Sequence, residues 1–488
     1  MIANKKLYYI FWILLILVQA VWIFNSGGYY FIDDGSHFNF SRHYIEQIAH
    51  STGAWHRMGR VILFALPAQF GLKGVQIFSA FIFLLTIYCC YKILKHYNVK
   101  YAEWIIPIIG FQPVLFNVSY TSLAELPAGF LIVLAFYSFI KDKPVQTMIA
   151  ASLVFIFRTE YFYAAGIYFL IYACRKNFRA LPYILLGPLM WYVYTTALTL
   201  NPLQFFTDMT LHSRLLKIDV GVEWYFYSLH SGKIFGFIQM LFFIIAVVIM
   251  VIKKQLNIYW IPIVTAIAGI GLQTLLALKG LNLTCSIGQL RYVAVIGPMI
   301  GIVAAYGLGY FFDSIKNKIV FLIVSLLLFA LMYIFGPYST PWHNKYKIDQ
   351  LSEQIVSDAK LNHPDYFILS NLHQIANAID EPQTGGEKFK MLNMTTMNKY
   401  QKCIIVWCRD LEGSPFVEDN VTLDKITTYP GVKLLKEYKD TVNNGYSAPI
   451  YQFRKEGGEY KTSRKIIDYL VHDQTTWEII DVKVFIKE

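Results

Sequence analysis

The chain has 488 residues, of which 56% are hydrophobic and only 15% are charged. Soluble domains carry about 25% charged residues, so this composition excludes an ordinary soluble protein. The net charge is +11, but a nucleic-acid partner is not indicated, because much of the excess lies in short clusters between apolar runs. Such clusters are typical of the cytoplasmic connections of membrane proteins. The sequence therefore predicts an integral membrane protein that contacts membrane lipids and crosses the bilayer several times.

Apolar runs predict an all-α polytopic bundle of about eleven transmembrane helices. The first run follows two lysines and lacks a small-residue cleavage site, so we expect a retained span. Basic residues in every second connection place the N-terminus inside and the C-terminus outside. Several segments, notably 103–116, are short for a bilayer and either tilt or lie buried in the bundle. The predicted spans are residues 7–25, 74–94, 103–116, 124–140, 145–157, 161–174, 181–200, 233–252, 257–278, 292–311 and 319–337.

The acidic pair Asp33-Asp34 lies shortly after the first span. Adjacent carboxylates repel each other and need water, so they place this end of the span outside the bilayer core. Simple solvation is the alternative to a chemical role. Ser36 is expected to cap a helix that runs to about Ser51 in the membrane interface. The apolar stretch 61–70 is too short to span and predicts a second interfacial or re-entrant piece.

Further ionisable residues lie near the apolar phase on the predicted outer face. Each costs at least about 2.5–3.5 kcal/mol at the centre of a span, so it needs a partner or a purpose. Opposite charges that converge beside an interfacial helix predict a cavity for an anionic lipid headgroup. These residues are Asp33, Asp34, His37, Arg57, Arg60, Glu125, Arg158, Glu160 and Arg291.

Structural explanations compete with this interpretation. Arg158 and Glu160 could pair with each other in a tight turn between spans, and Glu125 could stabilise a helix N-terminus. Arg291 and Tyr292 could be an interfacial anchor pair. The long outer segment 201–232 mixes aromatic and charged residues, which fits either membrane anchoring or contact with a sugar or lipid.

After Pro341 the composition becomes charged and mixed, which predicts a small soluble α/β domain. We therefore expect a membrane domain at 1–338 and an outer domain at 339–488. In the outer domain we expect strands at 366–369, 403–407, 449–453 and 482–486, and helices at 351–360 and 463–471.

Cysteine and histidine spacing indicates neither a disulfide framework nor a metal site. Cys403 and Cys408 are five apart in a predicted strand, so they should point to opposite faces. The spacing of His37, His43 and His56 is irregular and favours packing or hydrogen bonding.

The order and sidedness of these motifs resemble the GT-C superfamily of integral-membrane glycosyltransferases. The resemblance is to the branch with protein O-mannosyltransferases and the aminoarabinose transferase of lipid A. The run 32–37 looks like the acidic pair of that family's first outer loop, with Asp34 where many members have Glu. Glu125 matches a second acid before the fourth span, and the run 289–298 resembles a late Arg-Tyr followed by proline. The span count is below the family's usual number, and Arg158 is the nearest substitute for its lysine after the fifth span.

The resemblance, which covers residues 1–338, implies transfer of a sugar from a polyprenyl-phosphate donor. The acceptor would be a glycan, a lipid or a protein at the outer face. Asp33 would be the base, with Asp34 or Glu125 as an orienting partner. No cofactor is required, although some relatives use a divalent metal ion, Mg²⁺ or Mn²⁺. Because arginine forks fit phosphate, the implied substrate- and phosphate-binding residues are Arg57, Arg60, Arg158, Glu160, Arg291 and Tyr292.

Two other classes stay open, a lipid-linked-sugar flippase and a membrane scaffold of cell-envelope glycan assembly. A flippase would distribute ionisable residues on both sides of the midplane and would contain paired half-helices. The small outer domain favours the bacterial inner membrane, with the C-terminal domain extracytoplasmic. Asn-x-Ser/Thr sites would instead be glycosylation acceptors in a secretory pathway. These sites are Asn117, Asn282, Asn393 and Asn420.

Overall fold

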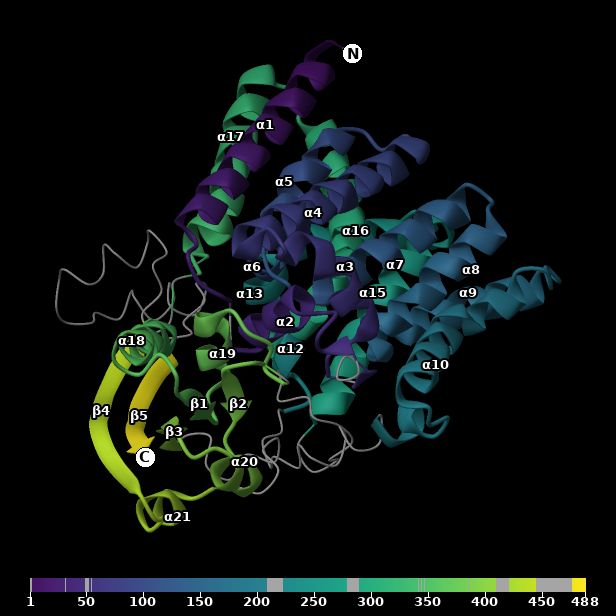
Figure 1. Cartoon of the computed structure of the whole chain (residues 1–488). Helices are drawn as coiled ribbons and strands as arrows, with labels where there is room; N and C mark the ends of the chain where they lie inside the picture. The colour runs from purple at the N-terminus through teal and green to yellow at the C-terminus, as the bar shows by residue number, and fades with distance from the viewer. Residues whose placement is uncertain are drawn as a thin grey trace.

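The computed structural model has a helical part, residues 2–340, and a sheet part, residues 347–488 (Figure 1). It describes residues 2–30, 32–48, 52–53, 55–208, 223–278, 289–340, 342–343, 345, 347–384, 386–409, 421–444 and 476–488.

The α-helices of the helical part follow the apolar runs of the sequence. They are α1 (Ile2–Asn25), α2 (Ile32–Arg42), α3 (Met58–Ala68), α4 (Gly71–His96), α5 (Ile105–Gly110), α6 (Pro113–Val118), α7 (Glu125–Ile140), α8 (Pro144–Leu153), α9 (Tyr163–Cys174), α10 (Leu186–Thr199), α12 (Phe226–Leu229), α13 (Ser231–Phe235), α14 (Phe237–Ile252), α15 (Leu256–Ala277), α16 (Gly297–Ser314) and α17 (Lys318–Phe335). Short 3-10 helices join them: η2 (Ala102–Trp104), η3 (Val154–Ile156), η4 (Thr159–Phe162), η5 (Leu181–Leu185), η6 (Leu290–Ile296) and η7 (Pro337–Ser339).

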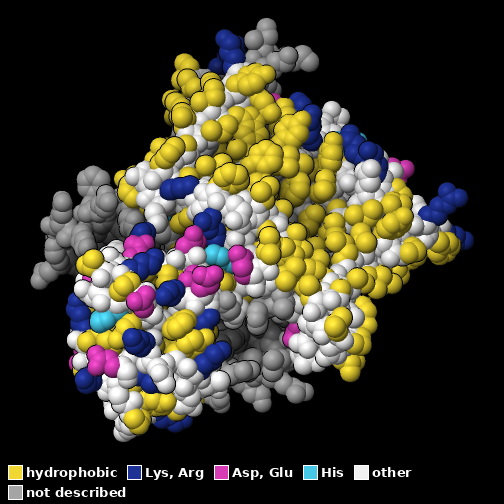
Figure 2. Space-filling model, in the orientation of Figure 1, with side chains coloured by type: hydrophobic (Ala, Val, Ile, Leu, Met, Phe, Trp, Pro, Cys, Tyr) yellow, Lys and Arg dark blue, Asp and Glu magenta, His cyan; other side chains and the backbone are white. Residues whose placement is uncertain are grey.

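The chain is an integral membrane protein with apolar side chains over most of the helical surface seen in Figure 2. All the predicted spans are helical, but the number eleven is not established, because several of these helices are short. Among the described residues, six segments are long and apolar enough to cross a membrane: Lys6–Asn25, Gly71–His96, Leu181–Thr199, Tyr259–Ala277, Leu290–Ser314 and Lys318–Ser339. Shorter apolar helices are Met58–Ala68, Glu125–Ile140, Pro144–Ile156 and Phe237–Ile252.

The predicted span 103–116 is not one helix. It divides into η2, α5 and α6, whose residues are all buried. Pro113 begins α6, and Gln112 before it is extended, as expected for a residue that precedes proline. This segment therefore lies inside the bundle, which is one of the two outcomes expected for a run of this length. By contrast, α1 and α17 lie side by side at the edge (Figure 1), where Phe11 stacks on Phe329 with ring centroids 5.6 Å apart.

The helix predicted for the first outer loop differs from the prediction in its bounds. It begins at Ile32 and ends at Arg42, so that Ser36 lies inside it and is not its cap. The physical reason is the acidic pair: Asp33 and Asp34 occupy the first turn, where the helix dipole favours negative charge. The second outer piece, α3, matches the predicted apolar stretch and ends near Pro67.

The sheet part contains a five-stranded sheet in the order β2-β1-β3-β5-β4. Strands β2, β1 and β3 run parallel, and β5 pairs antiparallel with β3 and with β4. The strands are β1 (Phe367–Ser370), β2 (Phe389–Met391), β3 (Cys403–Cys408), β4 (Val432–Asn444) and β5 (Thr476–Lys487). The helices are α18 (Lys347–Asn362), α19 (His373–Ile379), α20 (Met394–Lys399) and α21 (Leu423–Thr427).

Alternating side chains place helices on both faces of this sheet. Ile404, Val406 and Cys408 pack with α18 and α19 on one face. Cys403 and Ile405 pack on the other face with α20 and α21. The two cysteines therefore point to opposite faces, as predicted. The predicted helix 351–360 and the strands at 366–369, 403–407 and 482–486 are confirmed, whereas 449–453 and 463–471 lie outside the described residues.

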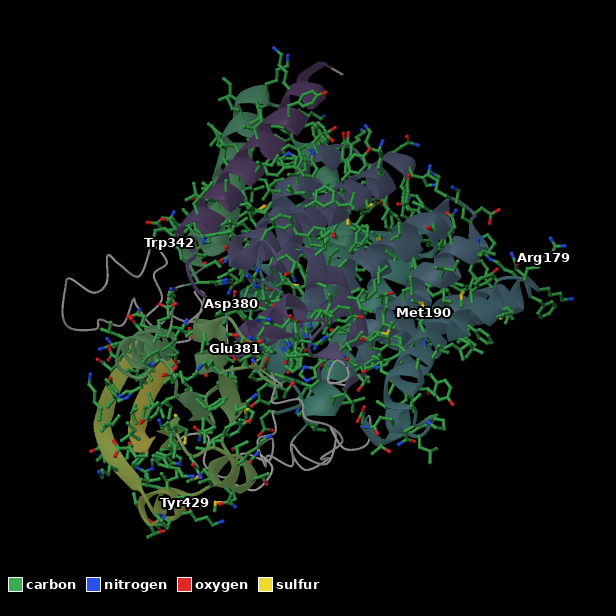
Figure 3. All side chains as sticks on the ribbon, viewed as in Figure 1. Arg179, Met190, Trp342, Asp380, Glu381 and Tyr429 are labelled. Atoms are coloured by element: carbon green, nitrogen blue, oxygen red, sulfur yellow. The ribbon has the colours of Figure 1, made fainter. Side chains whose placement is uncertain are left out.

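The connection after α17 packs against the helical part. Trp22 Nε1 donates to the carbonyl of Thr340 at 3.1 Å. The buried His343 ring lies with Nε2 2.6 Å from Asn117 Oδ1, so the predicted acceptor site at Asn117 is buried. The division at 338/339 stays a prediction. Arg179, in a basic cluster predicted to be cytoplasmic, lies at the right edge of the molecule, well away from Asp380 in the sheet part (Figure 3).

At Gly307, helix α16 packs so closely against α14 that there is no room for a side chain. A Cβ there would lie 2.4 Å from the Phe242 carbonyl oxygen in α14, whereas a Cβ at Gly271 in α15 would meet nothing within 4 Å. We expect Gly307→Ala to lower the free energy of unfolding by about 1–3 kcal/mol, because the helices must separate. Gly271→Ala should leave it unchanged or raise it by up to about 1 kcal/mol. Thermal unfolding in detergent measures both, and equal melting temperatures would contradict the packing.

Candidate active site

Oppositely charged side chains from separate segments meet in a continuous series of ion pairs. Asp33 Oδ2 lies 2.5 Å from Arg291 Nη2, and Arg291 Nε lies 3.5 Å from Glu125 Oε1. The same Glu125 oxygen lies 3.4 Å from Arg158 Nη2. One carboxylate therefore faces two guanidinium groups, while a second carboxylate holds one of them from the other side.

The series continues from Arg158 toward α3. Arg158 Nε lies 3.0 Å from Glu160 Oε1, and Arg57 Nη1 donates to Glu160 Oε2 at 3.1 Å. Burial acts to raise the pKa of Glu160, but the two arginines outweigh it and lower that pKa to about 2. A depressed carboxyl pKa stabilises the fold above the unfolded value of about 4.3, and this stabilisation is lost as the pH falls toward 2. Carboxylate and guanidinium groups alternate along the series of six side chains. We call Asp33, Arg291, Glu125, Arg158, Glu160 and Arg57 the charge network.

Helix ends position the carboxylates of the charge network. Asp33 lies in the first turn of α2, and Glu125 is the first residue of α7. Helix N-termini favour negative charge, so both positions suit their residues. The predicted structural explanation for Glu125 is thus true, but the same carboxylate also lies between two arginines. Arg291 is placed by η6, and Arg158 directly precedes η4.

Arg57 occupies a strained position at the end of the charge network. Its backbone has φ 58° directly before α3, a region that residues other than glycine, asparagine and aspartate rarely adopt. Such strain costs on the order of 1–3 kcal/mol and gathers at functional sites. The ion pair with Glu160 is therefore made from a strained backbone position.

Burial changes along the charge network. The side chains in its centre are closed off, with Glu125 2%, Arg291 5% and Arg158 7% exposed. Asp33 is 24% exposed and Arg57 is 16% exposed. The ends are therefore open to a substrate, whereas the centre holds fixed charge away from water. In that setting electrostatic interactions are stronger than in solution.

Tyr292 adds an aromatic face to the centre. Its ring centroid lies 4.4 Å from the guanidinium carbon of Arg158 and 5.5 Å from that of Arg291. Cation–π contacts of this kind hold arginine side chains in place when they are desolvated. Tyr161 Oη donates to the Tyr292 carbonyl at 2.7 Å and so fixes the backbone there.

The two adjacent aspartates have different surroundings. Asp34 is 1% exposed, and its Oδ1 accepts from the backbone N–H and the hydroxyl of Ser122 at 2.8 Å and 2.6 Å. Its Oδ2 accepts from the Tyr30 N–H at 3.0 Å. Burial raises the pKa of Asp34 above its ordinary value. Asp34 therefore joins α2 to the loop before α7, and the more exposed Asp33 faces the open side.

Arg60 lies outside the ion pairs of the charge network. Its guanidinium donates to the backbone carbonyls of His37 and His56, at 2.8 Å for His37, and the residue is fully buried. This contact joins α2 to α3. His37 packs on Trp55 with ring centroids 4.8 Å apart, and the ring of His56 lies 3.7 Å from that of Phe40. Burial, and to a smaller extent the positive charge of Arg60, lowers the pKa of His37 well below its ordinary value, so this ring is neutral.

Sequence reasoning missed Ser122 and Tyr30, the partners of Asp34. No residue pattern identifies a serine hydroxyl or a backbone N–H as the partner of a carboxylate 88 residues away. Residues 209–222, the middle of the predicted outer segment 201–232, lie outside the described residues, and the role of this segment stays a prediction.

The described residues do not form a divalent-metal site by themselves. Within the described ranges, no group of three or more His, Cys, Asp or Glu side chains comes together in a way that could hold a metal ion. Asp33, Glu125 and Glu160 each face an arginine instead.

Glu125→Gln tests whether the stability of the fold depends on the carboxylate that Arg158 and Arg291 share. We expect the free energy of unfolding to fall by about 3–5 kcal/mol, because two buried guanidinium groups lose their common counter-charge. Glu103→Gln is the matched control: Glu103 is 3% exposed and makes no ion pair with a described residue. Denaturation in detergent compares the two variants. An equal loss in both would contradict the dependence on the ion pairs.

Comparison with known proteins supports the fold. The chain is similar to ArnT from Cupriavidus metallidurans bound to undecaprenyl phosphate, with a TM-score of 0.61, 10% identity and coverage of 98% of this chain and 97% of that chain. The apo state of that ArnT gives a TM-score of 0.59 and 10% identity, over 99% of this chain and 98% of that chain. No protein-family model matches the sequence, and no curated protein matches it. The chain therefore shares the fold of ArnT over nearly its whole length.

Proposed function

We propose that this protein is a GT-C glycosyltransferase that transfers a sugar from a polyprenyl-phosphate donor to an acceptor at the extracytoplasmic face. The observation that carries the proposal is the charge network, which has a partly exposed carboxylate at one end and arginines along its length. The ArnT fold supports it, because that protein was crystallised with undecaprenyl phosphate.

Asp33 is the proposed base. It accepts the proton of the acceptor hydroxyl or amine as the acceptor oxygen or nitrogen forms a bond to the anomeric carbon. The bond between that carbon and the phosphate oxygen breaks, and its electron pair leaves with the polyprenyl phosphate. Asp34 cannot take this role, because Ser122 and the Tyr30 N–H already bind its carboxylate.

The arginines are the proposed phosphate ligands. Guanidinium forks fit phosphate oxygens and stay charged in an apolar site. Arg291 is held by Asp33 at 2.5 Å before donor binds. When the lipid phosphate approaches, it competes for Arg291 and so releases the Asp33 carboxylate as a base. Donor binding and activation of the base are thereby coupled in one ion pair.

Asp33→Asn tests the base. We expect kcat for sugar transfer to fall by about 10²–10⁴-fold, which is the usual contribution of a positioned base. The donor KM should not rise, because Arg291 keeps its charge and loses only its competitor. The measurement is transfer of sugar from a polyprenyl-phosphate donor by purified protein in nanodiscs.

Asp313→Asn is the matched control for that substitution. It removes the exposed ion pair to Lys100 at 2.6 Å on another part of the surface and should keep wild-type kcat. Wild-type activity of Asp33→Asn at normal protein levels would remove Asp33 from the catalytic role.

Arg57→Ala tests phosphate binding at the open end of the charge network. A hydrogen bond to a charged group contributes about 1.5–3 kcal/mol, so the Kd for undecaprenyl phosphate should rise by about ten- to a hundredfold. Arg57→Lys keeps the positive charge but loses the two-pronged guanidinium group. Its Kd for undecaprenyl phosphate should therefore lie between those of wild type and Arg57→Ala. Titration of undecaprenyl phosphate into nanodisc-embedded protein gives these constants, with Lys100→Ala as a control. Unchanged binding in Arg57→Ala would exclude Arg57 from the phosphate site.

An assay with the same polyprenyl-phosphate donor distinguishes a glycosyltransferase from a flippase and from a scaffold. An enzyme consumes the lipid-linked sugar, whereas a flippase moves it across a vesicle membrane without consumption. A scaffold does neither. The six residues of the charge network meet in one continuous series, whereas a transporter needs groups along a path through the membrane, and this favours the enzyme.

A further inference from the structure

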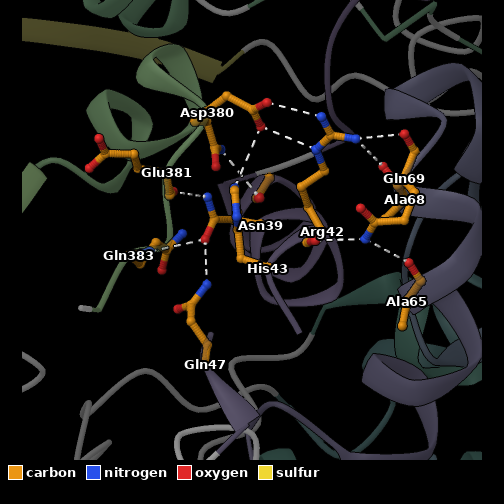
Figure 4. A network of polar contacts seen from close by, with 12 residues as sticks. Asn39, Arg42, His43, Gln47, Ala65, Ala68, Gln69, Asp380, Glu381 and Gln383 are labelled. Atoms are coloured by element: carbon orange, nitrogen blue, oxygen red, sulfur yellow. Dashed lines mark hydrogen bonds and ion pairs between the residues drawn. The ribbon is translucent and has the colours of Figure 1, made fainter. Parts of the chain in front are cut away.

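The loop that follows α19 in the sheet part lies directly against α2 (Figure 4). Arg42, the last residue of α2, is the joint between them. Its Nε and Nη2 donate to the two carboxylate oxygens of Asp380 at 3.1 Å and 2.9 Å. Its Nη1 donates to the carbonyls of Ala68 and Gln69, at 3.0 Å and 2.7 Å, and Gln69 Nε2 donates back to the Arg42 carbonyl at 2.7 Å. One side chain thus joins α2, the end of α3 and the sheet part.

A second contact holds the middle of α2. Asn39 Nδ2 donates to the Glu381 carbonyl at 2.8 Å. Asn39 Oδ1 accepts from the Gln383 N–H at 3.1 Å and from Gln47 Nε2 at 2.9 Å. Asn39 is 2% exposed, so each of its polar atoms is satisfied by a specific partner. Replacing such a partner leaves a buried polar group unpaired.

A third contact reaches the turn that carries the aspartates. Asn377 Nδ2 donates to the Gly35 carbonyl at 3.3 Å, and Gln383 Nε2 donates to Ser36 Oγ at 3.3 Å. A Cβ at Gly35 would lie 3.4 Å from Asn377 Nδ2 and 3.2 Å from Tyr29 Cδ2. The glycine therefore permits the close approach of the two parts.

The loop itself is fixed to the sheet. Asp380 has φ 60°, a left-handed conformation that aspartate tolerates better than most residues. The carboxylate of Glu381 accepts from the backbone N–H groups of Lys388 and Phe389, at 2.9 Å and 2.7 Å, where β2 begins. Residues 377–384 therefore move with the sheet and not as a free loop. We call them the 377–384 clamp.

We propose that the 377–384 clamp sets the position of Asp33, and that Arg42 and Asp380 are positioning residues for the transfer reaction. The inference rests on the proposed function, in which Asp33 is the base. Helix α2 carries Asp33 in its first turn and Arg42 in its last turn, about 14 Å apart for an α-helix. A short helix is stiff, so holding its last turn, its middle and its first turn fixes the direction of Asp33 relative to Arg291.

The Arg42–Asp380 pair is suited to a test because it is exposed. Its side chains are 24% and 59% exposed, and exposed ion pairs contribute little to global stability. Asp380→Asn should therefore fold. Figure 3 shows Asp380 and Glu381 on the side of the sheet part that faces the helices, so the substitution acts on the contact between the parts.

The experiment compares Asp380→Asn and Arg42→Lys with wild type in nanodiscs. Misplacement of a catalytic group by about 1 Å can lower the rate about a hundredfold. We therefore expect kcat to fall by about ten- to a hundredfold. The donor KM should stay within about twofold of the wild-type value. Glu353→Gln is the control. It removes the half-exposed ion pair between Lys345 and Glu353, whose atoms lie 2.6 Å apart, and neither residue of this pair belongs to α2. It should keep wild-type kcat.

Hydrogen exchange of the same variants provides a readout without donor. In Asp380→Asn, we expect faster exchange in residues 36–42 and 377–384, and unchanged exchange in α7 and α16. Faster exchange with wild-type kcat would overturn the positioning role. Unchanged exchange in both segments would overturn the clamp. If wild-type protein transfers no sugar, the proposed function fails, and the exchange data still decide whether the clamp holds α2.

Discussion

Glu125 lies between Arg158 and Arg291, and this sharing of one buried carboxylate by two guanidinium groups is the constraint that organises the rest of the site. Removing one partner of a buried ion pair costs about 3–5 kcal/mol. The start of α7, the turn before α9 and the entry to α16 must therefore meet at one point. Asp33 joins them because α2, which carries it in its first turn, begins a short connection after α1 ends.

Much of the charge network could be predicted from the sequence, because a charged side chain near the apolar phase costs free energy unless it has a partner. Arg158, Glu125 and Arg291 interrupt apolar runs, and the basic clusters between spans predict that they share one side of the membrane. The predicted cavity depends only on those features. The boundaries of α2 could not be predicted as well, because Ser36 is an equally good cap residue and only the packed structure selects Ile32 as the start.

Other features leave no signal in the sequence. Asp33 and Asp34 are chemically identical, and their separation into an open and a closed carboxylate depends on Ser122. The contact between Arg42 and Asp380 spans 338 residues and joins two ordinary surface charges. The outer part was predicted as a separate α/β domain, yet its loop lies along α2. The part of the molecule that looks least involved in the chemistry thus contacts the helix on which the proposed base stands.

The most direct measurement is a structure of the wild-type protein in nanodiscs with undecaprenyl phosphate bound. The account predicts the phosphate within hydrogen-bonding distance of Arg291 and at least one of Arg158 and Arg57, with the Asp33–Arg291 pair opened and the Asp34–Ser122 contacts intact. A phosphate bound elsewhere, with the 2.5 Å pair between Asp33 and Arg291 unchanged, would contradict it.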